Sequence, residues 1–192
     1  MKSETGVLIE RQGAVAVVTL NRLARREFSK PIVAAVNGVA LGGGFEIVLA
    51  CDLVVADEQA RFGLPEVKRG IVAAAGGIIR LSQRIPLAVA LEKALRAETI
   101  DAETAPRLDL VNRLVLTGEG RKSAIALADR LCKSAPLAVR LTKRKLRRAV
   151  PHDEGRLWDE QVEQLGPLLA SDDNIEGPRA FIETRRPIWQ AR

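Results

Sequence analysis

Three consecutive glycines, Gly42-Gly43-Gly44, stand between a short apolar run and a helix-like segment. Residues 32–36 before them are typical of a buried strand, residues 45–51 after them suit a helix, and residues 53–56 indicate another strand. Glycines bring no side chains to pack, so three in a row must serve the backbone, in a tight turn or beside a ligand. The order strand, glycine turn, helix, strand predicts a βαβ unit with a right-handed crossover, and hence an α/β fold.

The rest of the pattern predicts a β-hairpin before this unit and mainly helices after it. The hairpin strands are expected at residues 7–10 and 14–20. Residues 61–70 are expected to form a loop. The helices expected beyond that loop include residues 78–83, 157–170 and 178–186. We therefore expect a core over residues 1–120, which carries the functional site, and a C-terminal helical region over residues 121–192.

The chain is basic, with a formal net charge of +6, and the excess is concentrated in one stretch. Between Arg121 and Arg148, ten lysines and arginines stand against a single acid, Asp129. Such a run attracts anions, including nucleic acid. However, aromatic residues make up only 3% of the chain, and apolar residues interrupt the run as on a solvated helix face. We therefore expect no nucleic-acid partner, and RNA binding stands as an alternative from a different class.

The cysteines and the histidine limit the possible chemistry. Cys51 and Cys132 lie far apart in apolar, helix-like contexts, which favours buried thiols in a reducing compartment over a disulfide. With His152 as the only histidine, the sequence predicts no metal site and no Ser-His-Asp triad. Catalysis would then fall to carboxylates and backbone groups. The amino end lacks an apolar signal core and no run is long enough to span a membrane, so a cytoplasmic protein with no membrane partner is expected.

The glycine turn is a candidate binding site for negative charge. A helix amino end presents unpaired N–H groups and a partial positive charge, and glycines let a ligand approach them closely. Such a turn can bind phosphate or the oxyanion that forms from a carbonyl. The spacing departs from G-x-G-x-x-G and no Lys-Ser/Thr pair follows, which disfavours phosphate. A tight turn with close helix–strand packing is the structural alternative.

Two glutamates in apolar surroundings are candidate acid–base groups. Glu46 falls in the first turn of the expected helix, and Glu66 lies in the expected loop. A carboxylate among apolar residues is costly unless it is paired or used. Two glutamates beside one oxyanion site can share a water molecule and move protons at a carbon next to a carbonyl. The alternative is that Glu46 stabilises the helix dipole and that Glu66 pairs with Lys68 or Arg69.

Taken together, several short motifs resemble the crotonase (enoyl-CoA hydratase/isomerase) family, from about residue 7 to the C-terminus. They are Lys30-Pro31-Ile32-Val33-Ala34-Ala35-Val36-Asn37-Gly38, Gly42-Gly43-Gly44-Phe45-Glu46, Ala50-Cys51-Asp52, Phe62-Gly63-Leu64-Pro65-Glu66 and Gly76-Gly77. The resemblance is strongest to the carnitinyl-CoA dehydratase-like branch. Its markers are Gly70-Ile71-Val72, Ile175-Glu176-Gly177-Pro178 and the ending Arg186-Pro187-Ile188-Trp189.

The resemblance implies a spiral of ββα units with a C-terminal helical trimerisation region, forming homotrimers or dimers of trimers. It also implies an enoyl-CoA hydratase or 3-hydroxyacyl-CoA dehydratase that needs no separate cofactor, because coenzyme A is part of the acyl-CoA substrate. Glu46 would help to activate the water, Glu66 would handle the α-proton, and the N–H of Gly43 would be one oxyanion donor. The other implied substrate-binding residues are Leu41, Gly42, Phe181 and Arg185. An enoyl-CoA isomerase and a carnitinyl-CoA dehydratase are the alternatives within the family.

The sequence departs from the family pattern in three places. A strand–helix–strand segment, including the alanine that donates the second oxyanion hydrogen bond, is missing near Arg22–Leu23, and we expect residues to have been omitted there. A genuine deletion would favour an inactive structural homologue. Ala73-Ala74-Ala75 replaces a more polar segment, which disfavours carnitinyl-CoA itself. Thr184 stands where relatives often place a lysine near the coenzyme A phosphates, a place that Arg185 or Arg186 would take.

Overall fold

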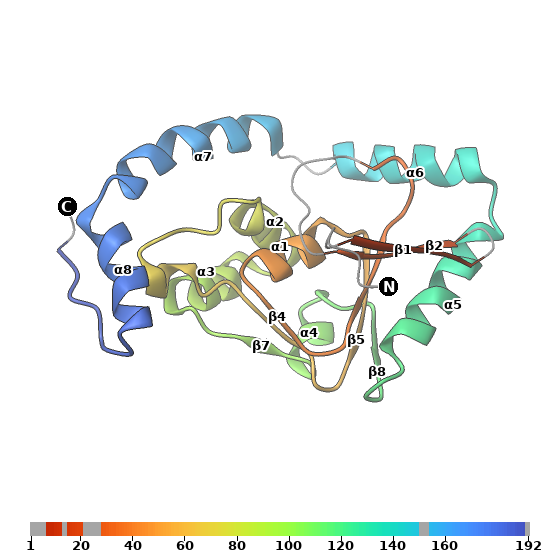
Figure 1. The fold of residues 1–192 in the computed structure, drawn as a ribbon. Coiled ribbons are helices and arrows are strands. Elements are labelled where there is room, and N and C mark those ends of the chain that lie inside the picture. The colour runs from red at the N-terminus through yellow and green to blue at the C-terminus, as the bar shows by residue number, and fades with distance from the viewer. Residues whose placement is uncertain (1–6, 13–14, 21–27, 150–153, 191–192) are drawn as a thin grey trace.

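The computed structural model describes residues 7–12, 15–20, 28–149 and 154–190, and shows a mixed α/β fold (Figure 1). The strands are β1 (Val7–Gln12), β2 (Val15–Leu20), β3 (Val33–Val36), β4 (Val39–Leu41), β5 (Leu53–Asp57), β6 (Arg61–Gly63), β7 (Ile100–Asp101) and β8 (Arg113–Val115). The helices are α1 (Gly43–Ala50), the 3₁₀ helix η1 (Glu66–Arg69), α2 (Gly77–Arg84), α3 (Leu87–Arg96), α4 (Thr104–Arg107), α5 (Gly120–Cys132), α6 (Pro136–Ala149), α7 (Glu154–Leu169) and α8 (Asp172–Ile182).

The predicted βαβ unit is confirmed. Strands β3 and β5 pair in parallel, with Val33 opposite Leu53, and α1 makes the crossover between them. Strand β8 extends this sheet on the other side of β5. Phe45 of α1 is fully buried and its ring lies 5.6 Å from that of Phe62 on β6. The aliphatic and phenylalanine side chains between α1 and the strands therefore form the centre of the core.

A second small sheet was not anticipated from the sequence. The segment expected to be only a turn contains β4, and the expected loop at 61–70 contains β6 and η1. Strand β4 pairs in parallel with β6, which pairs in turn with β7 in the antiparallel sense. These strands have only two or three residues each, too few to show a period of two in the sequence. Their pairing depends on tertiary packing.

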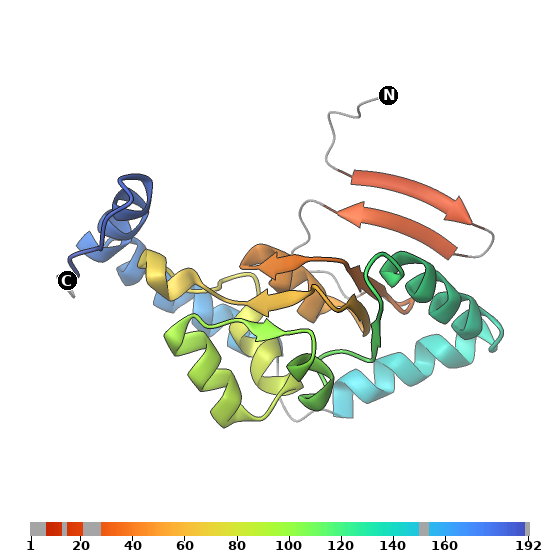
Figure 2. The same cartoon turned by 90° about the horizontal axis from the view of Figure 1, so that it is seen from below.

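The β1–β2 hairpin is confirmed and forms a sheet of its own (Figure 2). Within the described residues, β3 hydrogen bonds only to β5, and β4 only to β6, so each lies at the edge of its sheet. The expected omission near Arg22–Leu23 falls outside the described residues. An open edge at β3 is the geometry expected where a neighbouring strand is lacking.

The C-terminal helices were predicted with approximate bounds. Helix α5 packs against β3 and β5. Helix α7 begins earlier than expected, and α8 begins at Asp172 and carries Pro178 inside it. Helix α8 closes on η1 through two glycines: a Cβ on Gly177 would collide with the carbonyl of Arg69, and one on Gly70 with that of Asp173. Across the described residues, no helix is both long and apolar enough to cross a membrane.

Candidate active site

The amino end of α1 is open and is shaped by Gly42. This residue has φ +55° and ψ −128°, a conformation that suits glycine, and its N–H donates to the carbonyl of Gly63 at 2.9 Å. The next two residues, Gly43 and Gly44, begin the helix, and a Cβ on either would meet nothing within 4 Å. Amides in the first turn of a helix have no carbonyl partner within that helix. The predicted oxyanion donor, the N–H of Gly43, therefore lies at an uncrowded helix end.

Glu46 is held by the backbone of a distant turn. Its side chain is only 5% exposed, and its Oε1 accepts hydrogen bonds from the N–H groups of Ala75 (2.7 Å) and Gly77 (2.9 Å). These bonds provide the partners that a buried carboxylate requires. In the sequence, this contact is marked by the Gly76-Gly77 pair. Glycine is needed at position 77, because a Cβ there would lie only 2.9 Å from both Cγ and Oε1 of Glu46.

Glu66 opens η1, and its carboxyl group approaches the glycine turn. A Cβ on Gly42 would be 3.2 Å from its Oε1, while its Oε2 is buried without a hydrogen-bond partner in the described part of the chain. Burial, aided by the nearby charge of Glu46, raises the pKa of Glu66 above the ordinary glutamate value. The alternative, in which Glu66 pairs with Lys68 or Arg69, is not seen. Lys68 donates instead to the carbonyl of Ala97, and Arg69 lies over the ring of Phe181.

The remaining predicted site residues lie at varied distances from this centre. Leu41 is in β4, directly before the glycine turn, and is 38% exposed. Phe181 lies on α8 with the guanidinium of Arg69 3.4 Å from its ring centroid. Arg185 is bound by Glu176 in two hydrogen bonds of 2.5 and 2.8 Å and by Glu183 at 2.6 Å. A substrate phosphate at Arg185 would compete with these two carboxylates.

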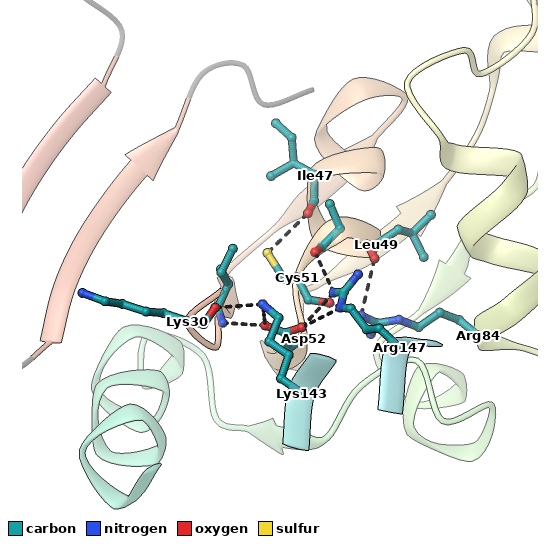
Figure 3. A network of polar contacts seen from close by, with 10 residues as sticks. Lys30, Ile47, Leu49, Cys51, Asp52, Arg84, Lys143 and Arg147 are labelled. Carbon is teal, nitrogen blue, oxygen red and sulfur yellow. Dashed lines mark hydrogen bonds and ion pairs between the residues drawn. The ribbon is translucent and has the colours of Figure 1, made fainter. Parts of the chain in front are cut away.

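The carboxyl end of α1 is capped by cations from two other helices, a feature that sequence reasoning missed (Figure 3). Arg84 of α2 donates to the carbonyls of Leu49 and Cys51, and Arg147 of α6 donates to that of Ala50. Positive groups at this end complement the helix dipole. Arg147 belongs to the basic run, so part of the helix face expected to be solvated contacts α1 instead.

Asp52 follows the helix and joins the same cluster (Figure 3). It accepts from Lys143 at 2.6 Å, from Arg147 at 2.7 Å and from the N–H of Ile32 at 2.7 Å. Its side chain is only 16% exposed. Helix α6 is thereby fastened to the crossover unit that carries the candidate site.

An adjacent cavity of about 230 Å³ lies between α2 and α7. Its walls are mainly aliphatic, with three polar side chains among them. The lining residues are Val72, Ile78, Ile79, Leu157, Glu160, Gln161, Gln164 and Leu165. The cavity exceeds the roughly 150 Å³ that accommodates benzene in a protein interior. Its position next to the turn that holds Glu46 makes it a candidate for an apolar group of a ligand.

The two cysteines differ from each other. Cys51 is buried as expected, and this burial raises the pKa of its thiol to about 11. Cys132 is exposed, so the expectation of a buried thiol is wrong there: it is the last residue of α5 and lies on the outer side of that helix. In the described ranges, no group of three or more His, Cys, Asp or Glu side chains is arranged to hold a metal ion.

The sequence is similar to a known protein family and to characterised proteins. The profile of the family described as Enoyl-CoA hydratase/isomerase matches residues 10–192. The carnitinyl-CoA dehydratase of Salmonella typhi is 42% identical over 170 residues, which cover 86% of this chain and 65% of the Salmonella protein. The chain thus spans just under two thirds of the length of this curated relative.

Solved structures of proteins from the same family resemble this chain as well. A carnitinyl-CoA hydratase from Mycobacterium avium is 46% identical with a TM-score of 0.82, over 86% of this chain and 65% of that one. A Mycobacterium abscessus structure named for the enoyl-CoA hydratase/isomerase group is 31% identical with a TM-score of 0.72, over 97% of this chain and 100% of that one. The expected crotonase fold is therefore confirmed, and the chain belongs to the enoyl-CoA hydratase/isomerase family.

Proposed function

We propose that this protein adds water to, or removes it from, an acyl-CoA thioester, as an enoyl-CoA hydratase-type lyase. The observation that carries the proposal is the convergence of two glutamates on one helix amino end. Glu46 stands in the first turn of α1, and the Glu66 carboxyl group lies against Gly42 at the start of the same turn. The family and the carnitinyl-CoA names of its relatives support acyl-CoA chemistry.

In the hydration direction, Glu46 accepts a proton from water as the water oxygen bonds to the β-carbon. The electron pair of the carbon–carbon double bond moves toward the thioester, whose oxygen gains enolate charge and accepts a hydrogen bond from Gly43. Protonated Glu66 then delivers its proton to the α-carbon, and a proton passes from Glu46 back to Glu66. The raised pKa of Glu66 suits a proton donor. Losing one oxyanion donor costs roughly 3–4 kcal/mol in known sites.

The acyl group is proposed to extend toward the cavity between α2 and α7. Its aliphatic lining fits a hydrocarbon chain, and Ala73-Ala74-Ala75 beside it offers no polar side chain. This favours a simple enoyl-CoA over carnitinyl-CoA. Isomerisation uses the same enolate and stays the alternative within the family.

Self-association is proposed on the exposed apolar residues of the C-terminal region. Leu137, Leu141 and Leu146 of α6 are 78%, 43% and 65% exposed, and α6 has no buried residue. A homotrimer or a dimer of trimers would cover exposed apolar residues of this kind. Light scattering coupled to size exclusion measures the assembly directly, and a monomer at micromolar concentration would contradict it.

The decisive experiment is crotonyl-CoA hydration followed by loss of the enone absorbance. The wild-type chain should consume the substrate, and Glu66→Gln should lose most of that activity while its circular dichroism spectrum is unchanged. A wild-type chain that binds acyl-CoA but converts neither crotonyl-CoA nor 3-hydroxybutyryl-CoA would instead identify an inactive homologue. If no residues are missing between β2 and β3, the edge positions of β3 and β4 favour the inactive homologue.

A further inference from the structure

Helix α7 contacts the turn that holds Glu46. Gln161 donates from Nε2 to the carbonyl of Ala74 at 2.6 Å, across a separation of 87 residues. One helical turn earlier, Trp158 lies so close that a Cβ on Gly76 would be 2.9 Å from its ring. Gly76 itself has φ +87° and is the N-cap of α2. Two side chains of α7, three residues apart and hence on one face, therefore press on this turn.

We infer that Gln161 is a positioning residue for Glu46, acting through one peptide group. The carbonyl of Ala74 and the N–H of Ala75 belong to the same peptide unit. Gln161 binds the oxygen of that unit, and Glu46 binds its hydrogen. Because the peptide bond is planar, fixing the direction of the C=O also fixes the direction of the N–H. The catalytic consequence of this contact rests on the proposed hydratase function, but the positioning does not.

The arrangement also strengthens the bond to Glu46. A peptide whose carbonyl accepts a hydrogen bond is polarised, which makes its N–H a better donor, so bonds in such a chain reinforce one another. Arg80 adds a parallel contact by donating to the carbonyl of Ala75 at 3.1 Å. That carbonyl belongs to the next peptide unit along the turn. The turn whose amides donate to Glu46 is thus held by side chains of α2 and α7.

Hydrogen exchange at single amides tests the positioning without any need for activity. Gln161→Glu keeps the size of the side chain and removes the donor at neutral pH. We expect the Ala75 amide to exchange about 10-fold faster in this variant, as follows from losing one hydrogen bond of about 1.4 kcal/mol. Glu163→Gln is the control, because it makes the reverse exchange of side chains of equal size at an exposed position of the same helix. Unchanged Ala75 exchange in Gln161→Glu would overturn the inference.

Kinetics tests the link to Glu46. In the wild-type background, Gln161→Glu should lower kcat about 10-fold with KM unchanged, while Glu163→Gln leaves kcat unchanged. In a Glu46→Gln background, Gln161→Glu should cause no further loss, because the group that it positions is already gone. Independent, additive losses would refute positioning through Glu46. A wild-type chain without turnover would refute the proposed function, and the exchange result would then decide the positioning alone.

Discussion

The two ends of α1 differ in how their backbone groups are satisfied. At the carboxyl end, Arg84 and Arg147 engage the last carbonyls and Asp52 binds α6. At the amino end, Gly43 and Gly44 face open space. One eight-residue helix is therefore anchored by charge at one end and left accessible at the other.

This division has a physical logic. Ligand-binding backbone must be uncovered, and uncovered backbone contributes little to stability. Fastening the opposite end holds the helix direction without occupying the amino-terminal amides. We expect substitutions at the amino end to affect chemistry more than stability, and substitutions at the carboxyl end to do the reverse.

The largest effect is expected at the amino end, from Glu66→Gln. Loss of the proposed α-proton donor should lower crotonyl-CoA hydration by about 10³-fold. The same variant should be more stable than wild type at neutral pH. The raised pKa means that folded Glu66 holds its proton to higher pH than unfolded Glu66, so the unfolding free energy of the wild type falls as pH rises between the two values.

The measurement is the melting temperature of both proteins at pH 4 and pH 7. At pH 4, close to the ordinary pKa of glutamate, the melting temperatures of the two proteins should differ little. At pH 7 the variant should melt higher than wild type. A variant that melts lower at pH 7 would show that burial of the Glu66 charge is not a cost in this fold.

At the carboxyl end, Asp52→Ala should lower stability by about 3 kcal/mol, because it leaves two partly buried cations and the N–H of Ile32 without their carboxylate. Denaturant unfolding measures the change. The control is Glu103→Ala, which removes the partner of Arg107 from an exposed pair and should cost at most about 1 kcal/mol. Equal costs for the two variants would remove the distinction between the anchored end and the surface.

Gly77→Ala should reduce activity about 100-fold and lower stability by about 1–3 kcal/mol. The new Cβ would lie 2.9 Å from Glu46 Cγ and would displace its carboxylate, and a shift near 1 Å costs roughly that much rate. Gly166→Ala in α7 is the matched control, since a Cβ there meets nothing within 4 Å and should stabilise the helix by about 0.5–1 kcal/mol. Full activity in Gly77→Ala would mean that Glu46 need not be held in this position.

The smallest effect concerns thiol reactivity. At pH 8, a maleimide should label exposed Cys132 in the native protein and leave Cys51 unmodified, because Cys51 is buried and its pKa is raised to about 11. Both thiols should react in denaturant. Mass spectrometry after brief labelling distinguishes the two sites, and native labelling of Cys51 would show that the anchored end opens readily.

Local patterns were sufficient for the parts of the fold that depend on neighbouring residues. The apolar runs around Gly42-Gly43-Gly44 predicted β3, α1 and β5, and the β-branched runs near the amino end predicted the hairpin. The positions of Glu46 and Glu66 in apolar sequence marked them as candidates before any geometry was known. Periodicity missed β7 and β8, because two or three residues carry too little of it.

The sequence by itself thus determined the strand–glycine–helix–strand unit and marked Glu46 and Glu66 as candidate acids. The tertiary structure alone decided their partners. Glu46 is bound by amides about thirty residues away, and Asp52 by α6 side chains more than ninety residues away. A local pattern depends on neighbours within a few residues, whereas these hydrogen bonds depend on how whole elements pack. The open end and the anchored end of α1 differ only because of that packing.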